Sequence, residues 1–260
     1  MSAAPEIRIM TDRQELAEEA AELFVWLGEQ ATTASGRFRV ALSGGTTPKG
    51  LYAALAGPDL CTNLAWPHVD FYFSDERCVP PDHPDSNFGM ANETLFRPLK
   101  IQPEHVFRMA GEDNRPERAA LQYEELLRKE LQAPAPAWPS FDLVLLGLGE
   151  DGHTASLFPG TQALDERERL VVATTAPQGV KNRLTFTAPV INNARAIVFL
   201  VSGSSKATAV RLALEVPNQS DPRIPARLIR PETGRLIWFL DRTAASELTI
   251  AKQGVVSHEE

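Results

Sequence analysis

The chain has 260 residues, of which 43% are hydrophobic and 23% are charged, and its formal net charge at pH 7 is −8. This composition is ordinary for a folded globular protein and excludes intrinsically disordered and fibrous classes. The negative balance argues against a nucleic-acid partner, and it requires that an anionic ligand be met by a local cationic pocket.

The first residues, MSAAPEIRIM, lack the charged region and the apolar core that together mark a signal peptide. The longest apolar runs, such as AIVFLV, are far too short to span a bilayer. The two cysteines, Cys61 and Cys78, can build neither a disulfide framework nor an all-cysteine zinc site. We therefore expect a cytoplasmic protein with reduced thiols and no membrane partner.

Short apolar runs alternate with amphipathic stretches, which is the pattern of an α/β fold with a mostly parallel sheet. The predicted strands are residues 37–44, 69–76, 141–149, 169–176, 183–190, 196–203 and 235–241. We expect a Rossmann-like sheet flanked by helices, with some antiparallel strands at one side. The chain is predicted to form a single domain over residues 1–260, with its core at about residues 10–245.

Helices are predicted between these strands. The first is expected to begin at Thr11, with Gln14 completing a capping box. The second is expected near Thr47 and Pro48, because proline suits the first turn of a helix. Further helices are predicted at residues 86–96, 118–131 and 204–216. The proline-rich stretch 132–140 is interpreted as a loop, because strand and helix alternate again directly after it.

The segment SGGTT, residues 43–47, joins a predicted strand to a predicted helix. Glycines let a backbone approach a ligand closely, and the free N–H groups at a helix start favour an anion such as phosphate. Gly44, Gly45 and Thr46 are therefore candidate phosphate ligands, with a simple tight turn as the alternative. The segment is not a Walker A loop, because Pro48 stands where that motif requires its second glycine.

Two other strand ends carry cations. Arg77 follows Asp75 and Glu76, and it would offer a planar donor fork to a phosphate; a surface set of ion pairs is the alternative. Lys206 lies in the first turn of a predicted helix, where a cation is unfavourable unless an anion lies beside it. Arg77 and Lys206 are thus candidate phosphate-binding residues, with a solvated lysine as the alternative for Lys206.

Residues 147–159 read GLGEDGHTASLFP and follow a predicted buried strand. Their glycines match a dinucleotide-binding turn, but Pro159 interrupts soon afterwards and no acid ends the next strand, so that hypothesis is disfavoured. His153 is instead a candidate general base, because imidazole titrates near neutral pH. Asp151 would orient it or stabilise its charged form. A structural role for His153 is the alternative.

Neither a serine-nucleophile elbow nor a histidine–cysteine ligand set occurs in the sequence. The residues therefore predict an enzyme with a phosphate cradle, a His–Asp base, and no metal or cofactor. Direct attack by water, or proton transfer, on a small phosphorylated substrate is the chemistry that this set suits.

These segments, in this order, resemble the 6-phosphogluconolactonase family over about residues 10–245. The stretches that carry the resemblance are SGGTTPKGLY, FYFSDERCVPPDHPDSN and GLGEDGHTASLFPG. The wider superfamily includes glucosamine-6-phosphate deaminases, in which the D-G-H turn continues toward an Asn-Glu-Pro sequence. Here TASLFPG, and the arginine after Glu76, follow the lactonase pattern.

The resemblance implies hydrolysis of 6-phospho-D-glucono-1,5-lactone to 6-phospho-D-gluconate, the second step of the oxidative pentose phosphate pathway. It implies that His153 deprotonates the attacking water, supported by Asp151. Arg77, Lys206 and the glycine loop would bind the phosphate. Arg183 would line the substrate pocket, and Asp75 matches the residue that transfers a proton in the deaminases.

Two alternatives stay open. One is a deaminase or isomerase that acts on an amino-sugar phosphate, and the other is a non-catalytic sugar-phosphate sensor on the same fold. The expected partner is a small sugar-phosphate lactone, and the expected assembly is a monomer or a weak homodimer.

Overall fold

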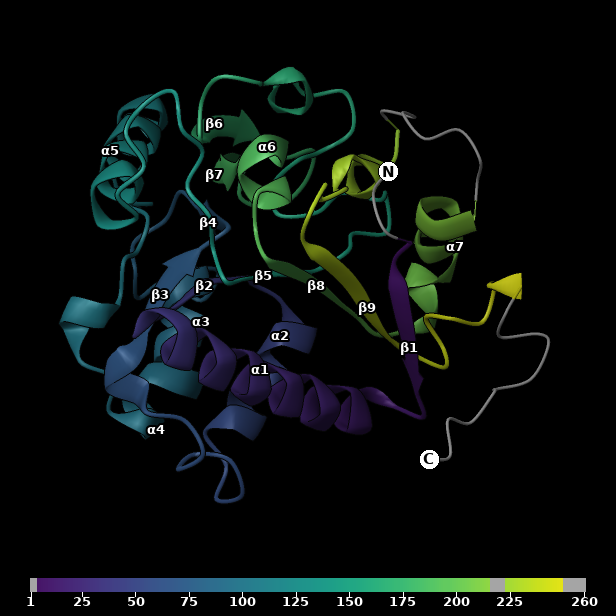
Figure 1. The fold of residues 1–260 in the computed structure, drawn as a ribbon. Helices are drawn as coiled ribbons and strands as arrows, with labels where there is room; N and C mark the ends of the chain where they lie inside the picture. The colour runs from purple at the N-terminus through teal and green to yellow at the C-terminus, as the bar shows by residue number, and fades with distance from the viewer. Residues whose placement is uncertain (1–3, 216–222, 250–260) are drawn as a thin grey trace.

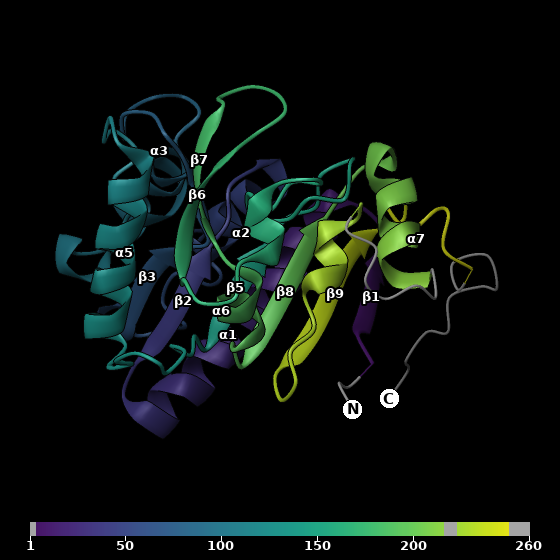
Figure 2. The same cartoon turned by 90° about the horizontal axis from the view of Figure 1, so that it is seen from above.

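The computed structural model describes residues 4–215 and 223–249. Its central element is a parallel six-stranded sheet in the order β1-β9-β8-β5-β2-β3 (Figures 1 and 2). These strands are β1 (Glu6–Met10), β2 (Phe38–Leu42), β3 (Val69–Phe73), β5 (Leu143–Leu146), β8 (Ala196–Val201) and β9 (Arg235–Asp241). A second, antiparallel sheet contains β4 (Asp75–Arg77), β7 (Asn182–Phe186) and β6 (Val171–Thr175). The predicted fold class is confirmed.

Helices cover both faces of the main sheet (Figure 1). They are α1 (Arg13–Ser35), α2 (Thr46–Leu55), α3 (Asn87–Ala91), α4 (Arg97–Leu99), α5 (Pro116–Glu130), α6 (Ala188–Asn192) and α7 (Ala207–Glu215). A π-helical segment, Asn92–Phe96, joins α3 to α4. Short 3-10 turns lie at Trp66–His68, Pro103–His105, Gln162–Asp165, Ser204–Lys206 and Pro225–Leu228. None of the helices in the described ranges combines the length and the apolar character needed to cross a membrane.

Two hydrophobic cores lie on opposite faces of the main sheet, and the buried central strands supply both. On β5, Leu143 and Leu145 pack with the core under α1 and α2, whereas Val144 and Leu146 pack with the core under α5 and α6. Alternation of side chains along a strand produces this division. A strand that is apolar at every position, such as LVLL, is therefore what a sheet covered on both faces requires.

Some predicted boundaries were wrong. Strand β1 was not predicted, because EIRIM is short, alternates polar with apolar residues and is only half-buried at the sheet edge. The residue that caps α1 is Asp12 and not Thr11, since the Asp12 carboxylate accepts from the N–H groups of Gln14 and Glu15. The helix predicted at 86–96 is divided into α3 and the π-helical segment, and Val216, at the end of another predicted helix, lies outside the described residues.

The strand predicted at 69–76 passes from one sheet to the other at Ser74. There the Ser74 N–H and hydroxyl both donate to the Leu42 carbonyl of β2, while the Ser74 carbonyl accepts from Phe186 of β7. Ser74 therefore closes β3 and begins the path into β4. This crossing carries Asp75 and Arg77 over the carboxyl end of the main sheet.

Strand order reverses between β2 and β5. From β2 the chain moves outward to β3, and from β5 it moves the other way to β8 and β9. The connections that leave β2 and β5 consequently run to opposite faces, toward α2 on one and toward β6, β7 and α6 on the other. In open α/β sheets, the crevice at such a reversal, outside the carboxyl ends of the strands, is the usual ligand site.

Candidate active site

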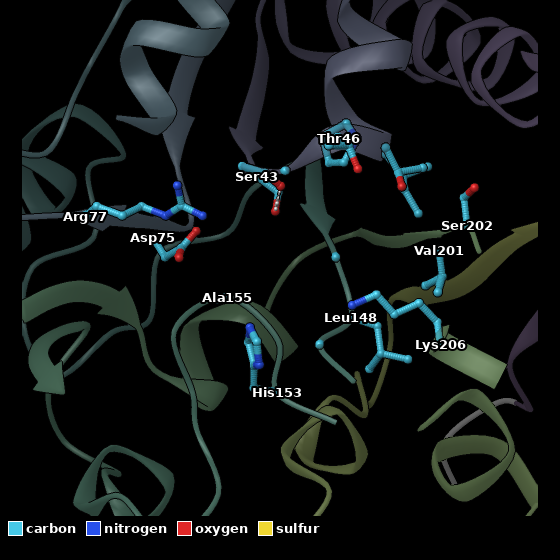
Figure 3. A pocket seen from close by; sticks show the side chains of 17 residues that line it. Ser43, Thr46, Asp75, Arg77, Leu148, His153, Ala155, Val201, Ser202 and Lys206 are labelled. Atoms are coloured by element: carbon cyan, nitrogen blue, oxygen red, sulfur yellow. Dashed lines mark hydrogen bonds between the residues drawn. The ribbon is translucent and has the colours of Figure 1, made fainter. Parts of the chain in front are cut away.

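A cleft lies at this reversal, at the carboxyl ends of β2, β5 and β8 (Figure 3). It has two adjoining parts, which we call the first cavity, of about 210 Å³, and the second cavity, of about 480 Å³. The first cavity is lined by the glycine loop, residues 43–48, by residues 147–149 and by the end of β8. Six residues line both cavities: Asp75, Arg77, Gly149, His153, Ala155 and Lys206.

The glycine loop is held by a residue of its own helix. The Tyr52 hydroxyl donates to the Ser43 carbonyl at 2.7 Å and accepts from the Ser43 N–H at 3.1 Å. Gly45 then precedes α2 with φ +105°, which favours glycine, and no side chain caps the helix there. The loop thus presents the start of α2 to the first cavity, where helix N–H groups attract an anion.

Gly44 has a reason to be glycine that the sequence did not indicate. A Cβ at this position would lie 1.8 Å from Oδ1 of Asn87. Asn87, the first residue of α3, therefore packs directly against the loop, and its amide donates to the carbonyl and to Oδ1 of Asp75. The absent side chain makes room for a protein side chain, in addition to any ligand.

His153 and Asp151 form a hydrogen-bonded pair at the border of the two cavities. His153 Nδ1 lies 2.5 Å from Asp151 Oδ1, and that oxygen also accepts from the His153 N–H. Burial alone would raise the pKa of Asp151, but the hydrogen bond from His153 and its charge outweigh burial and hold that pKa below its ordinary value. With Nδ1–H donating to the carboxylate, Nε2 is the atom that can accept a proton from a ligand.

The turn around this pair is shaped by Gly149. A Cβ there would lie 2.0 Å from His153 Nδ1 and 2.5 Å from Asp151 Oδ1, so the pair needs glycine at this position. The Gly149 N–H donates to the His153 carbonyl at 2.8 Å, which closes the turn. Phe158 packs against the imidazole with ring centroids 4.4 Å apart. Glycine and phenylalanine thus fix the ring of His153 at the cleft.

Asp75 and Glu76 are both buried, so the alternative of a surface ion-pair cluster was wrong for them. Glu76 accepts from the N–H groups of Arg77, Asn87 and Phe88, and from the Ser86 hydroxyl, and so anchors the start of α3. Burial raises the pKa of Glu76, in opposition to these backbone hydrogen bonds. Asp75 instead reaches the cleft and is held by Asn87 and Ser156.

Three cations reach the cleft. Arg77 and Arg183 lie directly opposite each other on the antiparallel strands β4 and β7, an arrangement that is unfavourable for like charges. Burial, followed by the charge of Arg77, lowers the pKa of Arg183. Lys206 reaches into the cleft from the 3-10 turn after β8 (Figure 3). Its Nζ lies 4.0 Å from Oε1 of Glu150. Cations gathered in this way favour an anionic ligand between them.

The structure brings all the predicted site residues to the one cleft. Gly44, Gly45, Thr46, Asp75, Arg77, His153 and Lys206 line the first cavity, and Asp151 and Arg183 line the second. Sequence reasoning missed Asn87, Ser156 and Phe158, although all three lie inside the stretches that resemble the lactonase family. In the described part of the chain, no group of three His, Cys, Asp or Glu side chains is arranged to hold a metal ion.

Comparison with known proteins gives one consistent family. Residues 11–238 match the family model described as glucosamine-6-phosphate isomerases/6-phosphogluconolactonase. A 6-phosphogluconolactonase from Synechocystis is 41% identical, over 94% of this chain and 99% of that protein. The human 6-phosphogluconolactonase is 36% identical, over 94% of each chain.

Solved structures agree with this likeness. A 6-phosphogluconolactonase from Trypanosoma cruzi superposes with a TM-score of 0.85 at 31% identity, covering 96% of this chain and 98% of the other. A monomeric glucosamine-6-phosphate deaminase superposes with a TM-score of 0.77 at 26% identity, covering 93% and 99%. The fold is therefore shared by proteins with two different chemistries.

Proposed function

Since the chain belongs to the glucosamine-6-phosphate isomerase/6-phosphogluconolactonase family, we propose that it hydrolyses 6-phospho-D-glucono-1,5-lactone to 6-phospho-D-gluconate. The observation that carries the proposal is the presence, in one cleft, of the Asp151–His153 pair and of three cations. The cations suit the phosphate of the substrate, and the pair suits activation of water beside it.

The proposed mechanism uses His153 twice. Nε2 of His153 removes a proton from water as the water oxygen attacks the lactone carbonyl, and the carbonyl becomes a tetrahedral oxyanion. Asp151 stabilises the imidazolium that forms. When the oxyanion collapses, the bond from carbonyl carbon to ring oxygen breaks, and the imidazolium returns its proton to that oxygen. The product acid then ionises in water.

The remaining groups bind and orient the substrate. Arg77, Lys206 and the N–H groups at the start of α2 attract the phosphate, and Arg183 adds positive charge to the second cavity. A δ-lactone is already an activated ester, so a positioned base that contributes about 10²–10⁴-fold is sufficient machinery. The mechanism requires no covalent intermediate.

The test is hydrolysis of the lactone, generated in situ from glucose 6-phosphate with a dehydrogenase and measured against a buffer blank. We expect His153→Ala to lower kcat about 10²–10⁴-fold and Lys206→Ala mainly to raise KM. His68→Ala is the matched control, because His68 is exposed and does not line the cleft. A wild-type rate equal to the blank would refute the proposal. Release of ammonia from glucosamine 6-phosphate would then identify a deaminase.

A further inference from the structure

The buried carboxylate of Asp75 has a defined place in the cleft and no part in the steps above. Asp75 is 6% exposed and lines both cavities. In Figure 3 it lies on the same side of the cavity as Arg77 and Ser43, across from His153. A buried carboxylate is costly unless hydrogen bonds compensate for the water that it has lost. The neighbours that provide those hydrogen bonds therefore determine what Asp75 can do.

Two neutral side chains provide them. The Ser156 hydroxyl donates to Oδ2 of Asp75 at 2.7 Å, and the Asn87 amide donates to Oδ1 at 3.1 Å. Both donors are buried, with 0% of Ser156 and 2% of Asn87 exposed. Among the described residues, the groups that hydrogen-bond to the Asp75 carboxylate are thus uncharged. Because each carboxylate oxygen can accept two hydrogen bonds, one acceptor position on each is left.

Ser156 is itself held firmly. Its N–H donates at 3.1 Å to Oγ1 of Thr185, which lies directly opposite Asp75 in the pairing of β4 with β7. The preceding residue, Ala155, has φ +47°, a left-handed conformation that is unfavourable for alanine. The hydrogen bonds of Ser156 to Asp75 of β4 and to Thr185 of β7 offset the cost of this conformation at Ala155. The turn thus delivers one hydroxyl to one oxygen of Asp75.

We propose that Ser156 and Asn87 are positioning residues that hold the Asp75 carboxylate toward the cleft, where it accepts a hydrogen bond from one ring hydroxyl of the substrate. Two neutral donors lie behind the carboxylate of Asp75, and its remaining acceptor positions are free, so a hydroxyl donor is the ligand group that matches it. Asp75 then selects for a hydroxylated sugar ring, and the inference rests on the proposed lactonase function.

The test asks whether loss of the Ser156 hydroxyl and loss of one ring hydroxyl of the substrate have coupled effects on kcat/KM. Wild type and Ser156→Ala are assayed on the full 6-phospho-lactone and on its 2-deoxy, 3-deoxy and 4-deoxy analogues. With the full substrate we expect kcat/KM to fall about tenfold in the variant, mostly through KM, because a hydrogen bond that Asp75 forms on binding is weakened. With one deoxy analogue, whose missing hydroxyl is the one that Asp75 receives, the same substitution should change kcat/KM less than about twofold.

Two further variants keep the experiment decisive. Asn87→Ala removes the second donor to Asp75. It should lower kcat/KM for the full substrate but leave kcat/KM nearly unchanged for the same deoxy analogue. Ser74→Ala is the matched control, because Ser74 is equally buried but its hydroxyl donates to the Leu42 carbonyl. An equal loss by Ser156→Ala on all four substrates, or no loss on any, overturns the inference while the wild type remains an active lactonase. A wild type that does not accelerate hydrolysis overturns the proposed function instead.

Discussion

Asp151 and Asp75 line the same cleft but are held in opposite ways. Asp151 is 40% exposed at its side chain, and its partner His153 is two residues away in the chain. Asp75 is buried, and its partners Asn87 and Ser156 are 12 and 81 residues away. The Asp151–His153 contact forms within a single turn, whereas the contacts of Asp75 with Asn87 and Ser156 require the folded arrangement of both sheets. We expect substitutions at the first to affect activity and substitutions at the second to affect stability as well.

The largest effect in this comparison should come from Gly149→Ala. The added methyl group would collide with both His153 Nδ1 and Asp151 Oδ1, so the pair must separate or turn away from the cleft. We expect kcat/KM for the lactone to fall at least about 10²-fold, approaching the loss of the base itself. Gly50→Ala is the control, because a Cβ there meets only ordinary contact with Ala17 at 3.4 Å. Nearly normal activity in Gly149→Ala would contradict the geometry of the pair.

An intermediate effect, on stability, should distinguish the two carboxylates. In Asp75→Asn the new amide group must face the hydroxyl of Ser156 or the amide of Asn87, leaving a buried donor without a partner. We expect this to lower the free energy of unfolding by about 1–3 kcal/mol. Asp151→Asn should change it by no more than about 0.5 kcal/mol, as is usual for exposed sites. Urea unfolding of both variants measures the difference, and equal losses would remove the distinction.

The difference in sequence separation between the partners of Asp151 and those of Asp75 explains which of these contacts could be predicted from the sequence. The D-G-H turn predicted the pairing of Asp151 with His153 because the residues lie within one turn, and their places at strand ends marked Arg77 and Lys206 as candidate phosphate ligands. Nothing in a single sequence connects Asp75 with Ser156, since their contact depends on the crossing at Ser74 and on the pairing of β4 with β7.

The sequence showed which glycines matter at the site, but it did not show which atoms approach them. Gly44 was expected to let a backbone approach phosphate, yet its missing side chain also accommodates Asn87. Gly149 fitted a dinucleotide turn, yet it makes room for the His153 ring. A glycine in the sequence indicates that some group approaches the backbone closely, but only the folded structure shows which group it is. For a similar reason β1 was missed, because an edge strand that is only half-buried has no strong hydrophobic pattern.

The smallest predicted effect is the pH dependence of stability that arises from Asp151. The hydrogen bond and the charge of His153 outweigh burial and lower the pKa of Asp151 in the folded protein below its ordinary value, so the folded state favours the ionised carboxylate. This contribution is fully present above about pH 4 and is lost as the pH falls through the lowered folded pKa. Because the side chain is partly exposed, solvent screening should keep it below about 0.5 kcal/mol. Urea unfolding at pH 5 should therefore show Asp151→Asn slightly less stable than wild type, and the difference should disappear well below pH 3.8. A difference that grows at low pH would reverse the sign of the coupling, and would mean that Asp151 is stabilised in its protonated form.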